Sequence, residues 1–139
     1  MLIATIEELE QEAMQLQAYL ETTMSEQAEE ALIRGNDLSA WVARTGKMKA
    51  DAKYRLNEAL QTGLIKQLVE ASKAIPNIST KAVNAIVDSA CRREHHLYDM
   101  IERLNRTATH QLDWCRSVLA TAREDRRAQV GINQGRYGQ

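Results

Sequence analysis

The sequence predicts an all-α protein, and three observations lead to this prediction. The 139 residues contain one proline and no phenylalanine, and only 4% of them are aromatic. Alanine, leucine, glutamate, glutamine, lysine and arginine dominate, and all of these favour helix. Apolar residues recur at steps of three and four, which is the spacing of one helix face. The length suits a single domain, which we place at residues 1–127.

The first predicted helix spans residues 5–33. Thr5 and Glu8 form a T-x-x-E capping box, in which a threonine oxygen accepts from a free backbone N–H of the first turn. Gly35-Asn36 is a typical C-terminal stop. The apolar stripe of this helix consists of Ile6, Leu9, Ala13, Leu16, Leu20 and Met24.

Two further helices are predicted at residues 37–45 and 47–74. Asp37 can cap the first of them, and Thr45-Gly46 marks the break between the two. Gly63 lies inside the second helix and costs up to ~1 kcal/mol relative to alanine. The predicted inward-facing residues of the second helix are Ala52, Leu56, Ala59, Leu60, Leu64, Leu68 and Ala71.

The last predicted helix is the longest and spans residues 79–127. It follows Pro76, and Ser79 or Thr80 can cap its first turn. After Arg127 the sequence holds three glycines and little apolar content, which predicts a flexible tail at 128–139. The stripe consists of Val83, Val87, Ala90, Leu97, Ile101, Leu104, Ala108, Cys115, Val118 and Ala122, with polar Glu94 and Gln111 in the same register.

The short loops favour antiparallel neighbours, so we expect an up-down-up antiparallel helical bundle with one very long C-terminal helix. A continuous helix over residues 81–127 would be ~70 Å long, whereas a compact domain of this size spans roughly 40 Å. Either this helix bends near residues 105–109 or its ends project. A projecting apolar stripe needs a partner, and we therefore expect a homo-oligomer.

The formal net charge of −1 hides a strong segregation of charge. Residues 1–33 hold eight glutamates and no lysine or arginine, while the rest of the chain holds 18 basic and 11 acidic side chains. An acidic first helix on a basic body can guide the assembly of the bundle. Alternatively, it can cover a surface that otherwise attracts anions.

Two features of the sequence bear on its surroundings. No segment approaches the ~20 apolar residues of a membrane span, and no positive region precedes an apolar stretch at the N-terminus. Cys91 and Cys115 would lie about 36 Å apart on one straight helix, which is too far for a disulfide. We therefore expect free thiols, a cytoplasmic location and no association with membrane.

A basic cluster is the most specific local feature. It is formed by Arg44, Lys47, Lys49, Lys53 and Arg55, with Tyr54 among them and Asp51 as the one acid. Cationic side chains neutralise phosphates and an exposed tyrosine stacks on an unpaired base, so these residues are candidates for binding single-stranded nucleic acid. The alternative is that the charges are solvated or pair with the acidic first helix. A second basic cluster comprises Arg123, Arg126 and Arg127.

Two His/Asp pairs raise the alternative of a metal-binding protein or enzyme. His96 and Asp99 are three residues apart, and His110 and Asp113 repeat this spacing on the same helix face. Carboxylate and imidazole at this spacing can share a metal. The two pairs would be ~21 Å apart, however, and several arginines share their face. We therefore expect no metal, no cofactor and no catalytic residues.

Two parts of the chain resemble small helical proteins of unassigned function encoded by phages, prophages and mobile elements of gut bacteria. The similar stretches are AWVARTGKM at 40–48 with ADAKY at 50–54, and RLNR at 103–106 with QLDWCR at 111–116. Genes for such proteins often lie near recombination and single-strand annealing genes. The resemblance implies a non-enzymatic interaction or accessory role in DNA recombination or replication, with a protein partner.

Overall fold

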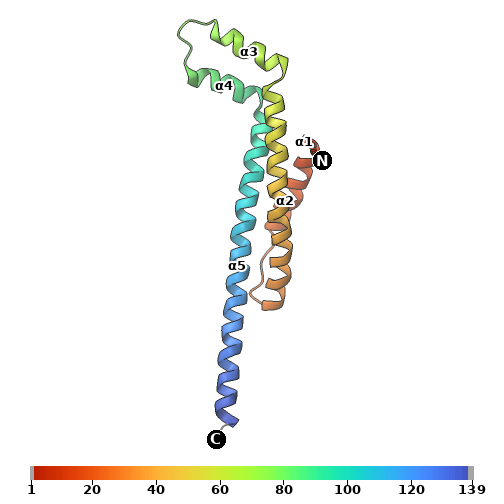
Figure 1. Ribbon diagram of the computed structural model, residues 1–139, viewed down its shortest axis with the longest axis vertical. Helices are drawn as coiled ribbons and strands as arrows, with labels where there is room; N and C mark the ends of the chain where they lie inside the picture. The colour runs from red at the N-terminus through yellow and green to blue at the C-terminus, as the bar shows by residue number, and fades with distance from the viewer. Residues whose placement is uncertain (1, 138–139) are drawn as a thin grey trace.

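The computed structural model describes residues 2–137, and within this range it holds five α-helices and no strand. The helices are α1 (Ile6–Leu20), α2 (Ala28–Leu60), α3 (Gly63–Lys73), α4 (Thr80–Ala90) and α5 (Arg92–Tyr137). The all-α prediction is confirmed, and so is the one very long C-terminal helix. Figure 1 shows α2 and α5 side by side and antiparallel, with α1 packed against them.

The molecule is elongated because its two ends extend beyond this three-helix bundle. At one end, α3 and α4 form a hairpin that turns away from the axis of α2 and α5 (Figure 1). At the other end, α5 continues past the start of α2 as a single helix. The up-down-up arrangement therefore holds for α1, α2 and α5. The predicted mismatch of lengths is resolved by projection of α5.

The core follows the predicted stripe of the first helix and the α5 part of the last predicted stripe, whereas Val83, Val87 and Ala90 of α4 are not buried. Residues at helical spacing on three helices face a common axis, and their apolar side chains leave water together, which is the main driving force for the bundle. Trp41 and Trp114 pack at the edge of this core. Its buried members are Leu9, Ala13, Leu16 and Leu20 of α1, Leu38, Met48 and Ala52 of α2, and Leu97, Ile101, Leu104, Ala108, Leu112 and Cys115 of α5.

The predicted helix 5–33 is wrong, because the chain leaves the helix after Leu20 and re-enters it only at Ala28. Side chains satisfy the carbonyl groups freed at this helix end. The Thr22 hydroxyl donates to the Tyr19 carbonyl at 2.6 Å, and Arg34 Nη2 donates to the same oxygen at 3.1 Å. At the start of α1, the predicted cap is present, since Thr5 Oγ1 accepts from the Glu8 N–H at 3.2 Å.

The predicted stops at Gly35-Asn36 and Thr45-Gly46 are also wrong, because α2 passes through both without a break. Asp37 consequently lies inside α2 and caps no helix. Gly35 is buried where α2 meets α5, and a Cβ there would lie 3.6 Å from the Cys115 Cβ. Tertiary packing along the whole of α2 outweighs the local cost of the two glycines.

The two remaining predicted helices are each divided. The helix predicted at 47–74 ends at Leu60, and Gly63 opens α3 instead of lying inside a helix. The helix predicted at 79–127 is interrupted at Cys91, between α4 and α5. No bend occurs at 105–109, where α5 is continuous. α5 also runs on to Tyr137, so residues 128–137 of the predicted flexible tail are helical, while residues 138–139 lie outside the described range.

The α3–α4 hairpin has a small core of its own. Leu56, Ile65 and Cys91 are buried together at its base, where it joins α2 and α5. Ser79 caps α4, since its Oγ accepts from the Ala82 N–H at 3.1 Å. No residue of α4 is fully buried, so this hairpin is packed less tightly than the three-helix bundle.

Candidate functional site

The predicted basic cluster lies in the second half of α2, and its first member is paired within the chain. Arg44 donates two hydrogen bonds to the Glu12 carboxylate of α1, from Nε at 3.0 Å and from Nη2 at 2.7 Å. This fork-to-carboxylate geometry is the strongest arrangement for an arginine pair. The hydrogen bonds to Glu12 raise the pKa of Arg44 above its ordinary value.

Two further members of the cluster hold the segment that precedes α1. Lys47 Nζ donates to Asp51 Oδ2 at 2.6 Å, and the Ala4 N–H donates to the same oxygen at 3.2 Å. Arg55 donates to the carbonyl oxygens of Ala4 at 2.9 Å and Ile3 at 3.0 Å. We call Lys47, Asp51 and Arg55 the clamp, because together they fix residues 3 and 4 against α2.

Asp51 is the most buried member of the clamp, with 8% of its surface exposed. Burial alone would raise the pKa of its carboxyl group. The hydrogen bonds from Lys47 and from the Ala4 N–H outweigh burial and hold the pKa of Asp51 below its ordinary value. The carboxylate is therefore charged at neutral pH and serves the packing of the chain.

The remaining cluster residues differ in accessibility. Lys49 Nζ lies 3.5 Å from Glu102 Oε1 and 5.7 Å from the centre of the Tyr98 ring, both on α5. Lys53 and Tyr54 are exposed, and within residues 2–137 Lys53 enters no ion pair. Of the six residues predicted to bind nucleic acid, these two are the exposed ones, and the Arg55 guanidinium lies 5.7 Å from the centre of the Tyr54 ring. Binding of nucleic acid stays a prediction.

The acidic first helix does pair with the basic body of the chain. Besides the Glu12 pair with Arg44, Arg93 at the start of α5 donates to Glu10 at 3.0 Å and lies 3.5 Å from Glu7. Solvent screens exposed ion pairs of this kind and makes them weakly stabilising, so the buried leucines of α1 provide most of its attachment. The charge segregation accordingly serves the assembly of α1 onto the bundle.

The junction between the end of α1, α2 and α5 was not predicted from the sequence. Arg34 Nη2 donates to Gln111 Oε1 of α5 at 2.8 Å, and Gln111 Nε2 donates to the Leu20 carbonyl at 2.9 Å. The Arg34 guanidinium stacks 4.0 Å from the centre of the Tyr19 ring, and burial raises the pKa of Tyr19. Gln111, a polar residue within the apolar stripe of α5, was the sequence feature that could have indicated this junction.

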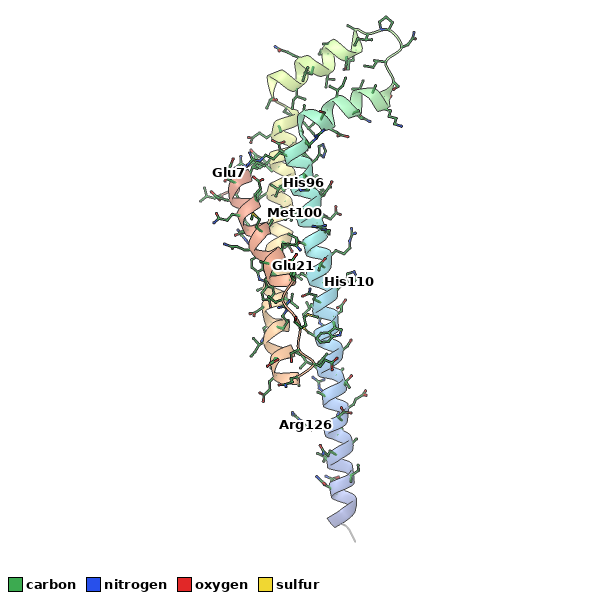
Figure 2. The ribbon with its side chains drawn as sticks, turned by 180° about the vertical axis from the view of Figure 1, so that it is seen from behind. Glu7, Glu21, His96, Met100, His110 and Arg126 are labelled. Carbon is green, nitrogen blue, oxygen red and sulfur yellow. The ribbon has the colours of Figure 1, made fainter. Side chains whose placement is uncertain are left out.

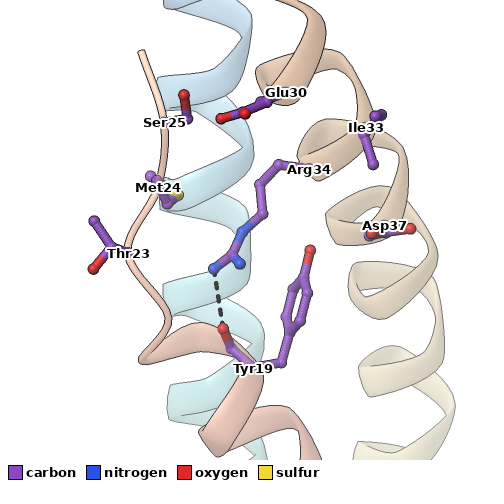
Figure 3. A pocket seen from close by; sticks show the side chains of 8 residues that line it. All are labelled: Tyr19, Thr23, Met24, Ser25, Glu30, Ile33, Arg34 and Asp37. Atoms are coloured by element: carbon purple, nitrogen blue, oxygen red, sulfur yellow. Dashed lines mark hydrogen bonds between the residues drawn. The ribbon is translucent and has the colours of Figure 1, made fainter. Parts of the chain in front are cut away.

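A hollow of about 240 Å³ lies beside this junction. Figure 3 shows the side chains that line it. Tyr19 and Arg34 form one wall of the hollow, and the Arg34 hydrogen bond to the Tyr19 carbonyl closes its base. Glu30 and Asp37 of α2 add acidic groups to the rim. The shallow opening therefore carries one basic and two acidic side chains.

The far end of α5 offers a different kind of surface. Residues 123–137, which we call the α5 extension, continue beyond α2, and every side chain described there, at 123–135, is exposed. Val130 and Ile132 are 49% and 66% exposed. Arg126 marks the extension in Figure 2. The second basic cluster lies on one face of this helix, since Arg123, Arg126 and Arg127 line a common shallow hollow with Val130, Gly131 and Gln134.

An acidic surface lies at the same end of the molecule. It is formed by Glu26, Glu29 and Glu30, all exposed, and we call it the acidic end of α2. Leu32 and Ile33 follow directly, with 53% and 63% of their surfaces exposed. Within the described part of the chain, neither these glutamates nor Arg123, Arg126 and Arg127 form an ion pair. This end therefore carries two unpaired surfaces of opposite sign.

The His/Asp face shows no assembled metal site. His96 and His110 are exposed and lie well apart along α5 (Figure 2). Asp113 pairs with Arg116 at 3.2 Å. Over residues 2–137, no three histidine, cysteine, aspartate or glutamate side chains converge closely enough to hold a metal ion.

The cysteines and the hydropathy of the helices complete the description. Cys91 and Cys115 are free and buried, and burial raises the pKa of both thiols. None of the helices, as far as the structure describes them, combines the length and the apolar content that crossing a membrane requires.

No protein-family model, curated protein or solved structure matches this chain.

Proposed function

We propose that this protein is a non-enzymatic helical interaction protein that works as a homo-oligomer. The observation that carries the proposal is the α5 extension. An isolated helix of about 15 residues is only marginally stable in water, and Gly131 and Gly135 lower its helix propensity further. A neighbouring helix from another molecule would supply the packing that this segment lacks within its own chain.

The buried polar groups also support a role in binding rather than catalysis. Thr45 accepts from the Asn105 side chain at 2.7 Å, and Ser72 donates to the Val69 carbonyl at 2.7 Å. Asp51 is occupied by the clamp. Thr45 joins α2 to α5, Ser72 bonds within α3, and Asp51 holds the segment before α1, so these buried polar groups serve packing.

The sequence resemblance supports a more specific setting for this role. The resemblance at residues 40–54 and 103–116 implies a protein encoded by a phage or mobile element, with its gene near recombination and annealing genes. We propose that this chain is an accessory protein in DNA recombination or replication, acting through protein contacts. Affinity capture from the native host, with identification of the co-purified proteins, would test this setting.

Light scattering coupled to size-exclusion chromatography tests the proposal itself. The chain has a mass of 15.7 kDa, so a self-associating protein elutes with at least twice this mass at micromolar concentration. The mass should fall on dilution. A mass of one chain at every concentration up to 100 µM, which is roughly the upper range of such an assay, would contradict self-association.

A second candidate function is binding of single-stranded nucleic acid, and the exposure of Lys53 and Tyr54 favours it. The ammonium group can reach a phosphate, and the tyrosine ring can stack on a base. Fluorescence anisotropy with a labelled oligonucleotide at low salt tests this function. The double variant Lys53→Gln, Tyr54→Ala should weaken binding, while the control Lys66→Gln on α3 should not. An unmodified protein that binds no oligonucleotide at low salt would exclude it.

A further inference from the structure

We propose that the partner of the α5 extension is a second copy of this chain, joined by a two-fold axis. In this pair, the α5 extension of each protomer lies along the start of its partner's α2. Arg123, Arg126 and Arg127 then face the acidic end of the partner's α2. This inference rests on the proposed function and names the surface that performs it.

The direction of the arginine face argues for a contact between molecules. Asp125 and Glu26 line the same hollow between the start of α2 and α5, so the Asp125 face of the helix points towards its own α2. A helix turns about 100° per residue, which places Arg123 on nearly the opposite face. Arg126, Arg127 and Val130 lie close to Arg123 around the helix. The arginines therefore point away from the glutamates of their own chain.

The charges of the two surfaces are complementary. Residues 21–33 contain four glutamates and no basic residue, and the arginine face carries three positive charges. Glu124 lies to the side of this face, and Asp125 lies behind it. A two-fold interface uses each contact twice, so the three arginines and three glutamates of one protomer become two matched sets.

The lengths and the apolar side chains of the two surfaces also match. The α5 extension of about 15 residues is ~22 Å long, the same as the first 15 residues of α2. Val130 and Ile132 are exposed on the extension, and Leu32 and Ile33 are exposed at the start of α2. The two helices run parallel in such a two-fold pair, because α2 and α5 are antiparallel within each chain. With Arg123 opposite Glu26, the same register places Val130 opposite Ile33, and these two side chains would be shielded from water.

An exchange of charges between the two surfaces tests this interface. One variant carries Arg123→Glu, Arg126→Glu and Arg127→Glu, and the other carries Glu26→Arg, Glu29→Arg and Glu30→Arg. Each variant alone places like charges opposite each other, so its dimer dissociation constant should rise at least tenfold, measured by sedimentation equilibrium. An equimolar mixture of the two should form a heterodimer close to the original affinity.

Control variants separate this effect from general changes in charge or folding. The pair Arg103→Glu, Arg106→Glu reverses charges on an exposed part of α5 away from the interface and should leave the dissociation constant within about threefold. A chain with all six interface charges reversed should dimerise like the original chain. Circular dichroism melts confirm that each variant remains helical.

The outcomes discriminate between the interface and the proposed function. A chain that is monomeric at all concentrations overturns both. A dimer that neither charge-reversed variant weakens overturns this interface and leaves self-association through another surface. A weakened dimer that the mixture and the six-fold reversed chain both fail to restore also overturns the pairing of arginines with glutamates.

Discussion

Replacing Asp51 by alanine tests the structural interpretation of the basic cluster. The Asp51 carboxylate accepts from Lys47 at 2.6 Å and from the Ala4 N–H at 3.2 Å, and it is almost fully buried. Its removal leaves the Ala4 N–H without its acceptor in a partly buried position. The segment before α1 should loosen, and the free energy of unfolding should fall.

The size of the effect follows from the two contacts. A partly buried donor that loses its acceptor costs about 1–3 kcal/mol. The side chain of Lys47 is 37% exposed, so solvent screening limits its pair to about 1 kcal/mol. We therefore expect a loss of about 2 kcal/mol. For a chain of this length, that corresponds to a fall in melting temperature of roughly 8 °C.

A thermal melt followed by circular dichroism at pH 7 measures this loss. Asp113→Ala is the matched control, since Asp113 also pairs with a basic residue of its own helix, but its side chain is 60% exposed. The control should change the melting temperature by less than about 2 °C. Equal shifts for the two variants would refute the assignment of Asp51 to a buried clamp.

Three further predictions concern pH, a glycine and the thiols. The pKa of Asp51 is lowered in the folded state, so its stabilisation is present above the unfolded pKa of about 3.9 and is lost as pH falls through the folded value. The stability difference between the original chain and Asp51→Ala should stay constant above about pH 5 and shrink in acid; a difference that grows in acid would contradict this. Gly46→Ala should stabilise the protein by about 0.5–1 kcal/mol in urea unfolding, because a Cβ there meets nothing within 4 Å, and a destabilised variant would contradict a continuous α2. Cys115 should react with a thiol reagent more slowly than Cys91, which lies at a helix junction. Mass spectrometry of the labelled peptides measures both rates, and the reverse order would contradict this prediction.

The sequence predicted the helical class and much of the core because both depend on local periodicity, although the predicted inward-facing Leu68 and Ala71 are exposed. Leu9, Ala13, Leu16 and Leu20 recur at helical spacing, and each is buried in the structure. The helix ends were less predictable, since they depend on contacts distant in the chain. Gly35 is a typical stop in sequence, yet α5 packs against it and the helix continues. The break at Cys91 was not predicted, because no glycine or proline lies there. The nearby Glu94, which interrupts the apolar stripe, was the one available signal.

The contacts of the candidate site were also not predictable from local sequence, because they join residues distant in the chain. Spacing along α2 brought Arg44, Lys47, Lys49 and Arg55 together as one basic cluster. Their partners are the Glu12 carboxylate, the backbone of residues 2–4 and Glu102, which come from three segments of the chain. Only the fold reveals that these cations are engaged internally. The same is true of Arg34 and Gln111, which are 77 residues apart and meet at 2.8 Å.

Hydrogen exchange of the α5 extension most directly tests whether this helix is covered by another molecule. Peptides from residues 123–135, analysed by mass spectrometry, report the protection of its backbone N–H groups. We predict slow exchange at high protein concentration and faster exchange on dilution, because a solitary helix of this length opens readily. Exchange at the rate of an unstructured peptide at every concentration would contradict the proposal that a second chain packs on α5.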